Sequence, residues 1–408
     1  PQHIDALHFL GVLVNQRGQS QRAVELISQA LEIAPNNAAA HSNLGLALQE
    51  LKRFDEAIAS YDRSLALKPN NAEAYYNRGN ALLAVKRYEE AILDYDRALA
   101  IKPDYAQAFS NLGNVLLAVK RYQQALASYE SALTINPDFA EALAGRGAVL
   151  NSLKRFTEAL SSYEHALAIK PDLEFIRGTR LHTKMNICAW HEFDHDLDEL
   201  TKAIDRGEKV SIPFTIQAVS SSAALQKKAA EIYSQAKHPS HFLSPPLIKH
   251  AHSKIKLGYF SSDFCQHAVS YLIAELFERH DRSRFEIIAF SFHEASDKDD
   301  MRLRLEAAFD QFIDVSEQSD EQVVRLARQL EIDIAVDLNG CTEGCRTDIF
   351  ALRAAPIQVN YIGYLGTMGA DYIDYLLADS VLIPTEHQAY YQEKIAYLPY
   401  SFQVNDST

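Results

Sequence analysis

Residues 69–103 read PNNAEAYYNRGNALLAVKRYEEAILDYDRALAIKP, and this stretch decides the fold of the first part of the chain. It runs from one proline to the next, and the same interval separates all members of a longer series: Pro35, Pro69, Pro103, Pro137 and Pro171. A fixed period of about 34 residues is typical of repeat architectures, in which each copy is one supersecondary unit. Residues 1–171 are therefore expected to hold five copies of one unit.

Three further positions recur with the same period. They carry a glycine, an alanine and, in the last four copies, a tyrosine: Gly11, Gly45, Gly79, Gly113 and Gly147; Ala23, Ala57, Ala91, Ala125 and Ala159; Tyr61, Tyr95, Tyr129 and Tyr163. The pattern closely resembles the tetratricopeptide repeat, which is a helix pair. Small residues suit the close crossing of paired helices, an aromatic ring fills the gap between them, and proline ends the second helix. The expected fold is an α-solenoid with a long concave face.

An asparagine stands two residues before the glycine in three consecutive copies, as Asn43, Asn77 and Asn111. Asparagine is a mediocre residue in a helix interior, whereas its amide can pair with both the N–H and the C=O of a peptide backbone. We expect these three residues to line a groove that binds polypeptides. Surface variation within a repeat consensus is the alternative, and Phe9 and Gly145 replace the asparagine in the first and last copies.

The composition excludes several classes of protein. The chain has 408 residues, of which 47% are hydrophobic and 23% charged, as expected for two or three globular units. It has neither a secretory leader nor a long apolar run, and its 4 cysteines are too few for a disulfide framework, so a cytoplasmic protein without a membrane anchor is expected. The net charge of −14 falls almost wholly after residue 171, and this acidic part is a poor match for nucleic acid.

Residues 172–252 break the period and are interpreted as a helical connector that caps the solenoid. They include Trp190 and a predicted helix near residues 223–233. Histidines and acidic residues gather at His191, Asp194 and His195, and again at four later histidines: His238, His241, His250 and His252. A metal site is conceivable there, but a solvated helix face explains the first group better, and no metal is expected.

Residues 253–408 alternate short apolar runs with helical patterns. The runs at 255–260, 285–292, 311–315, 332–338 and 357–364 are predicted strands, and three helices are predicted at 271–277, 301–309 and 321–330. Near-continuous apolar strands joined by helices indicate a parallel sheet covered on both faces, a Rossmann-like α/β domain. Ligands bind beyond the carboxyl ends of such strands, so the loops after the first, fourth and fifth strands are the candidate sites.

Each of these loops carries a candidate feature. His267, in SSDFCQHAVSYL at 261–272, is predicted at the N-terminus of a helix, where the macrodipole favours a neutral imidazole that can accept a proton. A capping or packing histidine is the alternative. The loop at 363–369 has glycines at Gly363, Gly366 and Gly369, which fit either a ligand cradle or a tight turn. Cys341 and Cys345, in the loop after the fourth strand, are expected to pack rather than to bind zinc.

The repeats, the connector and the runs LGYFSSDFCQHAVSYL, IDIAVDLNG and IFALRAAPIQVNYIGYLGTMGADYIDYLLAD together resemble the bacterial branch of the O-linked N-acetylglucosaminyltransferase family, kin to the Spindly-type O-fucosyltransferases. The resemblance covers nearly the whole chain. It implies that the repeats deliver a flexible polypeptide to a catalytic unit of two Rossmann-like domains. It also implies that a Ser or Thr hydroxyl attacks the anomeric carbon of UDP-N-acetylglucosamine with inversion, and that no metal or other cofactor is needed.

The resemblance assigns roles to the candidate residues. The family's histidine in an SSDF…H loop matches His267, the expected catalytic residue, which either takes the proton of the hydroxyl or contacts the sugar. The family's GYPGTSG loop matches Gly363, Gly366, Thr367 and Gly369, expected to bind substrate, with Leu365 and Met368 in place of the proline and the serine.

The family's nucleotide-binding domain, which would follow this region, has no counterpart in residues 1–408. We therefore expect an incomplete form, the acceptor half of a transferase, which is inactive by itself. The sequence leaves two alternatives open. One is a tetratricopeptide scaffold with an inactive catalytic remnant, and the other is an enzyme that uses GDP-fucose or UDP-glucose.

Overall fold

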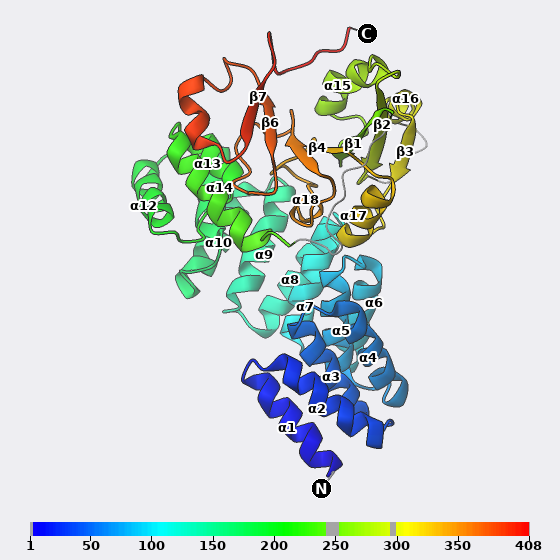
Figure 1. The fold of residues 1–408 in the computed structure, drawn as a ribbon. Coiled ribbons are helices and arrows are strands. Elements are labelled where there is room, and N and C mark those ends of the chain that lie inside the picture. The colour runs from blue at the N-terminus through cyan, green and yellow to red at the C-terminus, as the bar shows by residue number, and fades with distance from the viewer. Residues whose placement is uncertain (1–2, 242–252, 294–298, 408) are drawn as a thin grey trace. The chain divides into compact units, whose positions relative to one another are not determined.

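The computed structural model describes residues 3–241, 253–293 and 299–407, and these form two compact units, Pro1–Leu173 and Glu174–Thr408. The first unit contains helices only, and the second combines helices with a sheet (Figure 1). Most of the predicted connector falls within the second unit. His250 and His252 lie outside the described residues.

The first unit is a row of ten helices in five antiparallel pairs. Their bounds are α1 Ile4–Gln16, α2 Ser20–Ile33, α3 Ala38–Glu50, α4 Phe54–Leu67, α5 Ala72–Ala84, α6 Tyr88–Ile101, α7 Ala106–Ala118, α8 Tyr122–Ile135, α9 Ala140–Ser152 and α10 Phe156–Ile169. Each second helix ends two residues before a proline of the periodic series, because proline lacks the N–H and clashes with the preceding turn. The predicted α-solenoid is confirmed.

The periodic glycines and tyrosines explain how the two helices of a pair approach each other. A Cβ atom on Gly113 would stand 2.8 Å from Cζ of Tyr129, and Gly45, Gly79 and Gly147 have similarly close tyrosine neighbours. The tyrosine ring is fully buried, so it fills the space that the missing side chain leaves. In the first copy Ile27 takes the place of the ring against Gly11.

The second unit begins with four helices: α11 Ile176–Asn186, α12 Phe193–Asp205, α13 Pro213–Val219 and α14 Ala223–Lys237. They share a small core that includes Leu181, Leu200 and Ile216. Helix α14 confirms the helix predicted near residues 223–233, and Ser222 caps its N-terminus. The capping of the solenoid by this segment stays a prediction.

A parallel sheet of seven strands follows, in the order β3-β2-β1-β4-β5-β6-β7. The strands are β1 Ile255–Ser261, β2 Phe285–Ser291, β3 Gln311–Asp314, β4 Ile334–Asp337, β5 Ile357–Asn360, β6 Tyr375–Ala378 and β7 Lys394–Tyr397. All five predicted strands are present, and the Rossmann-like α/β assignment is confirmed. Strands β6 and β7 were not predicted, because a loop or the short helix η1 (Thr385–Tyr390) precedes them instead of a long helical pattern.

Helices cover both faces of this sheet. Helices α15 (Ala268–Glu278) and α16 (Asp300–Ala308) pack on one face, in a core with Phe264 and Phe277. Helices α17 (Asp320–Gln329) and α18 (Asp348–Ala351) pack on the other, with Phe260 and Phe350. The carboxyl ends of the strands remain for the loops, which lie where ligands bind in sheets of this kind.

Candidate functional site

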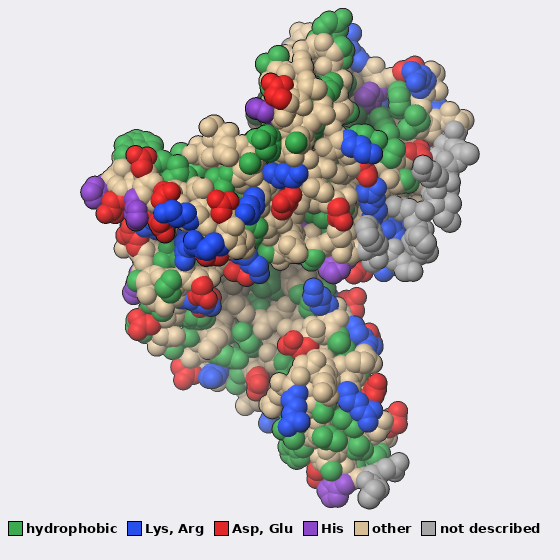
Figure 2. Space-filling model, turned by 60° about the vertical axis from the view of Figure 1, so that its left-hand side comes forward, with side chains coloured by type: hydrophobic (Ala, Val, Ile, Leu, Met, Phe, Trp, Pro, Cys, Tyr) green, Lys and Arg blue, Asp and Glu red, His purple; other side chains and the backbone are tan. Residues whose placement is uncertain are grey.

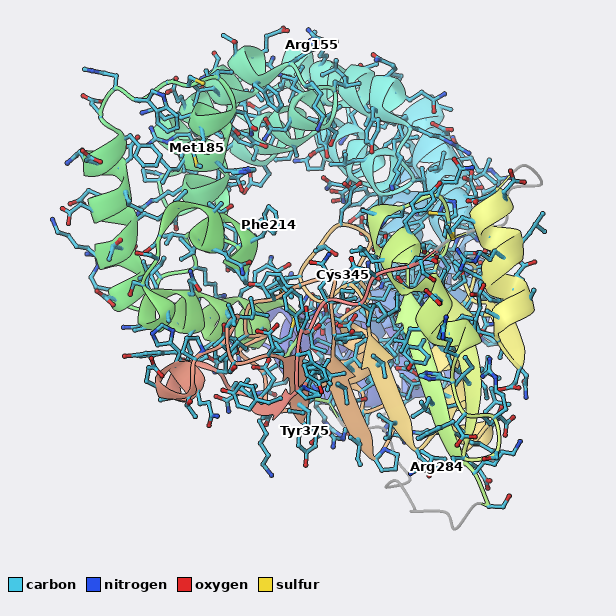
Figure 3. The ribbon with its side chains drawn as sticks, turned by 90° about the horizontal axis from the view of Figure 1, so that it is seen from above. Arg155, Met185, Phe214, Arg284, Cys345 and Tyr375 are labelled. Atoms are coloured by element: carbon cyan, nitrogen blue, oxygen red, sulfur yellow. The ribbon has the colours of Figure 1, made fainter. Side chains whose placement is uncertain are left out.

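Polar side chains end three neighbouring strands whose inner parts are apolar. Ser261 is the last residue of β1, Asp337 the last of β4 and Asn360 the last of β5, and Asp337 and Asn360 are register partners. In Figure 3 Cys345 marks the loop after β4, and Arg284, just before β2, lies at the other end of the sheet. The parallel order therefore brings the loops after β1, β4 and β5 together at one edge.

His267 lies at the strand-to-helix turn where the sequence places it. It is the N-cap of α15, its backbone is extended, and its Nδ1 accepts the N–H of Val269 at 3.3 Å. The side chain is 47% exposed, so solvent and ligands can reach the ring. The histidine is thus both a helix cap and an accessible imidazole, which fits the functional and the capping interpretations alike.

A carboxylate lies behind this ring. Asp263 Oδ2 is 3.6 Å from Nδ1 of His267 and accepts a hydrogen bond from Asn339 Nδ2 at 2.9 Å. Asn339 is fully buried, and its Oδ1 accepts the backbone N–H of Ser262 at 2.8 Å. One amide therefore joins the loop after β4 to the loop after β1.

The neighbouring strand end holds a buried carboxyl with one oxygen that lacks a partner. Oδ1 of Asp337 accepts the N–H groups of Asn339 and Gly340 at 2.9 and 3.0 Å. Its Oδ2, like Oδ1 of Asn360 on the adjacent strand, has no hydrogen-bond partner among the described residues. Burial, aided by the negative charge of Asp263, raises the pKa of Asp337 to about 6.

The glycine-rich loop lies against its own chain. A Cβ atom on Gly363 would stand 1.8 Å from the carbonyl oxygen of Leu338, and one on Gly369 would stand 2.4 Å from the backbone of Ala230 in α14. Gly369 also has a φ of +62°, which favours glycine. Gly366 lies against the ring of Tyr364. These contacts account for the glycines as residues of a tight, packed turn, and a role in substrate binding stays a prediction.

The side chain of Thr367, like the glycines of this loop, is engaged in contacts within the protein. Its hydroxyl donates to Oε2 of Glu393 at 2.7 Å, and the other oxygen of this carboxyl accepts the N–H of Met368 at 2.6 Å. Glu393 is 4% exposed, and burial raises its pKa against the effect of these hydrogen bonds. Met368, which replaces a serine of the family motif, is fully buried beside Cys341. The buried carboxyl therefore fixes the shape of the loop.

Cysteines and histidines form no metal centre in the part of the chain that the structure describes, where no group of three or more His, Cys, Asp or Glu could hold an ion. Cys341 packs at the edge of a core, as expected, and burial raises the pKa of its thiol. The side chain of His191 is 93% exposed next to Glu192, as predicted for a solvated face.

Two asparagines of the solenoid series have partners within it, and the third is buried. Nδ2 of Asn43 is 2.8 Å from Nε2 of His8, and Nδ2 of Asn111 donates to Oδ1 of Asn80 at 2.8 Å. Asn77 is only 7% exposed. The three amides are therefore less free than a ladder of open peptide contacts requires, and peptide binding by them stays a prediction.

Two observations concern the surface. Among the described helices, none combines the length and the apolar character that a bilayer crossing needs. On the face shown in Figure 2, Lys and Arg side chains are interspersed with Asp and Glu.

The structure thus combines five tetratricopeptide units with a Rossmann-like α/β domain, which carries a half-exposed histidine at the carboxyl edge of its sheet. Sequence comparison shows which families the two parts of the chain resemble. Residues 219–408 match glycosyl transferase family 41, and segments between residues 16 and 173 match tetratricopeptide repeats. The match to glycosyl transferase family 41 covers fewer than half of the 408 residues, and the repeat matches lie in the part of the chain before it.

Individual proteins are similar to this chain over part of their length. The chain is 32% identical over 242 residues to the probable UDP-N-acetylglucosamine–peptide N-acetylglucosaminyltransferase SEC of Arabidopsis thaliana, which covers 55% of this chain and 25% of that protein. It is 32% identical over 237 residues to the corresponding Caenorhabditis elegans enzyme, covering 54% of this chain and 20% of that one. The chain thus spans a quarter or less of these relatives. A solved O-GlcNAc transferase of Thermobaculum terrenum is 23% identical, with a TM-score of 0.38 over 91% of this chain and 58% of that one.

Four residues of the site were not singled out from the sequence: Asp263, Asp337, Asn339 and Glu393. The sequence contained a pattern that could have identified two of these residues. Asp337 and Asn339 are polar residues at and just after the end of an apolar strand, which is where a parallel sheet gathers its ligand-binding loops. Glu393 gave no such signal, because its partner Thr367 is 26 residues away in the chain.

Proposed function

We propose that the protein transfers N-acetylglucosamine from UDP-N-acetylglucosamine to Ser or Thr hydroxyls of polypeptides, with inversion at the anomeric carbon. The match of residues 219–408 to glycosyl transferase family 41 carries this proposal. The donor and the kind of acceptor are those that the names of the Arabidopsis and Caenorhabditis relatives state for those proteins. The tetratricopeptide solenoid supports a polypeptide acceptor, because such superhelices usually bind extended peptides. The chain has only four cysteines, and none of them forms a disulfide in the described residues, which supports a reducing, cytoplasmic setting.

His267 is the proposed proton acceptor. Attack of a hydroxyl on the anomeric carbon is faster when a nearby base removes the proton, and such assistance is worth about 10²- to 10⁴-fold in rate. The imidazole is accessible and lies at the carboxyl edge of the sheet. No residue among those described is proposed to hold a metal.

A capping role and a chemical role of His267 can be separated by two substitutions. His267→Asn retains a side-chain acceptor of the type preferred at helix N-caps, whereas His267→Ala removes it. We expect both variants to lose at least about 10²-fold in kcat, and only the alanine variant to lose stability. His195→Ala, an exposed histidine of α12, serves as the matched control. Transfer that survives in His267→Asn would show that the histidine acts only as a cap.

The assay measures incorporation of labelled sugar into a Ser/Thr peptide and into a matched peptide with alanine at those positions. It is run on the 408-residue chain and, separately, on the protein that the whole open reading frame of its gene encodes. UDP-N-acetylglucosamine is expected to be the best donor, and a preference for GDP-fucose or UDP-glucose would overturn that assignment. Binding of unmodified peptides without transfer from any donor, in both forms of the protein, would identify a scaffold instead.

A further inference from the structure

The interaction between His267 and Asp263 bears on which nitrogen of the ring carries the proton. In the present geometry Nδ1 accepts the N–H of Val269, so a neutral ring carries its proton on Nε2. In that tautomer Nε2 is a donor and cannot take a proton from an acceptor hydroxyl. The proposed role of His267 therefore requires the other tautomer, with the proton on Nδ1.

A proton on Nδ1 needs an acceptor, and Asp263 is placed to be one. Its Oδ2 is 3.6 Å from Nδ1, slightly beyond hydrogen-bond range, while the competing bond to Val269 is long at 3.3 Å. Nδ1 can make only one of these two bonds, because it carries either a proton or a lone pair. Hydrogen bonds of catalytic groups are often long in structures without substrate and shorten in the complex.

The carboxylate of Asp263 is held in a fixed orientation. Oδ1 accepts from the hydroxyl of Ser262 at 2.8 Å, and Oδ2 accepts from Nδ2 of Asn339 at 2.9 Å. The orientation of the Asn339 amide is set by its surroundings, since its oxygen faces the N–H of Ser262 and its nitrogen faces the carboxylate. The side chain of Asp263 is 15% exposed, so its charge is screened less than that of a surface residue.

We propose that Asp263 is a positioning residue for the proposed transfer, selecting the Nδ1–H tautomer of His267 and stabilising the imidazolium that forms. This inference rests on the proposed function. In the step it describes, Nε2 takes the hydroxyl proton as the oxygen–carbon bond to the sugar forms. The bond from the anomeric carbon to the diphosphate breaks, and its electron pair leaves with UDP. A buried acid that orients a histidine base is an established arrangement in hydrolases, and the physical reason is the same here.

Among the described residues, the contacts of this loop involve three carboxylates. Asp263 faces Nδ1, and Asp299, the N-cap of α16, approaches the same loop through the backbone N–H of Gln266 at 2.9 Å. Asp337 lies one step further, behind Asn339. Asp263 is therefore the carboxylate whose removal should change the state of the ring.

The first test needs no transferase activity. The 408-residue chain is labelled with ¹⁵N-histidine, and the signals of His267 are identified by their loss in His267→Asn. We expect the carboxylate of Asp263 to outcompete the long contact to Val269 in solution, so that the wild type has the Nδ1–H tautomer at alkaline pH and Asp263→Ala loses it. Glu286→Gln, which removes a carboxylate near the amino end of β2, should leave the ring unchanged. An identical tautomer in wild type and Asp263→Ala overturns the inference, whatever the activity.

The second test asks whether the tautomer matters for catalysis, in whichever form of the protein transfers sugar. Asp263→Ala should lower kcat by about 10²-fold or more with little change in KM for the acceptor, and Asp263→Asn should lower it less. The double variant Asp263→Ala/His267→Asn should be no slower than His267→Asn, because both residues act through one ring.

A tautomer shift with unchanged kcat would overturn the positioning role. If the wild type transfers no sugar from any donor, the proposed function fails, and the tautomer result still decides whether Asp263 sets the state of His267.

Discussion

At the scale of single residues, Asp337 carries a carboxyl at a position where the fold favours a neutral group. It is 2% exposed, its Oδ2 is unpartnered among the described residues, and the amide oxygen of Asn360 on the next strand also lacks a donor. Two buried oxygens without donors are costly, and a proton on Asp337 would remove part of that cost. This explains why burial raises the pKa of this carboxyl to about 6 from its ordinary value of 3.8.

A stability prediction follows for Asp337→Asn. The folded protein binds the proton more tightly than the unfolded chain, so the contribution of Asp337 to stability is present below about pH 4 and is lost as the pH rises through about 6. A shift of this size corresponds to about 3 kcal/mol at most. The asparagine variant cannot ionise and supplies an N–H. Its free energy of unfolding, relative to the wild type, should therefore increase between pH 4 and pH 7, as measured by denaturant titration. A difference that stays constant over this range would contradict the prediction.

At the scale of elements, the sequence predicted what periodicity can encode. The helix pairs follow from glycine, tyrosine and proline at a fixed spacing, and the strands β1 to β5 from apolar runs separated by turn or helical patterns. Strands β6 and β7 were missed because a loop or the short helix η1 precedes them in place of a long helical pattern. Asp263 and Asn339 could not be paired from the sequence, because 76 residues separate them and only the parallel order of β1 and β4 brings them together.

The role of Asn43, Asn77 and Asn111, on three helices of the solenoid, can be tested by substitution. Alanine at positions 43, 77 and 111 together should weaken binding of a long protein acceptor by several-fold if the amides bind its backbone, while a short peptide that does not need the groove is unaffected. Because Asn43 and Asn111 also bond within the solenoid, the triple variant should lose about 1 to 3 kcal/mol of stability. Binding is measured by calorimetry at a temperature where the variant remains folded.

A matched control for this experiment is Asn151→Ala in α9, which removes an amide bonded to Tyr163 on the partner helix of its repeat. It should cost stability to a similar degree and leave acceptor binding intact. Equal loss of binding in Asn151→Ala and in the triple variant would mean that the amides act only through the folding of the solenoid.

At the scale of the whole molecule, the chain has separate hydrophobic cores in its two compact units. The cores of the first unit lie between neighbouring helix pairs, whereas the cores of the second lie on the two faces of its sheet and among α11 to α14. Each unit therefore has the means to fold by itself. We expect calorimetry to resolve two unfolding transitions, and the repeat unit to unfold less cooperatively because its helix pairs contact only their neighbours.

Two substitutions assign these transitions. Gly113→Ala places a Cβ atom 2.8 Å from the buried ring of Tyr129, and this overpacking should destabilise the first unit by about 1 to 2 kcal/mol, after the better helix propensity of alanine is counted. Asp337→Asn acts in the second unit, and only at neutral pH. Each variant should move one transition and leave the other in place, because Gly113 and Asp337 lie in different compact units. A single transition that both variants shift together would mean that the units unfold as one body, and that their cores are not energetically independent.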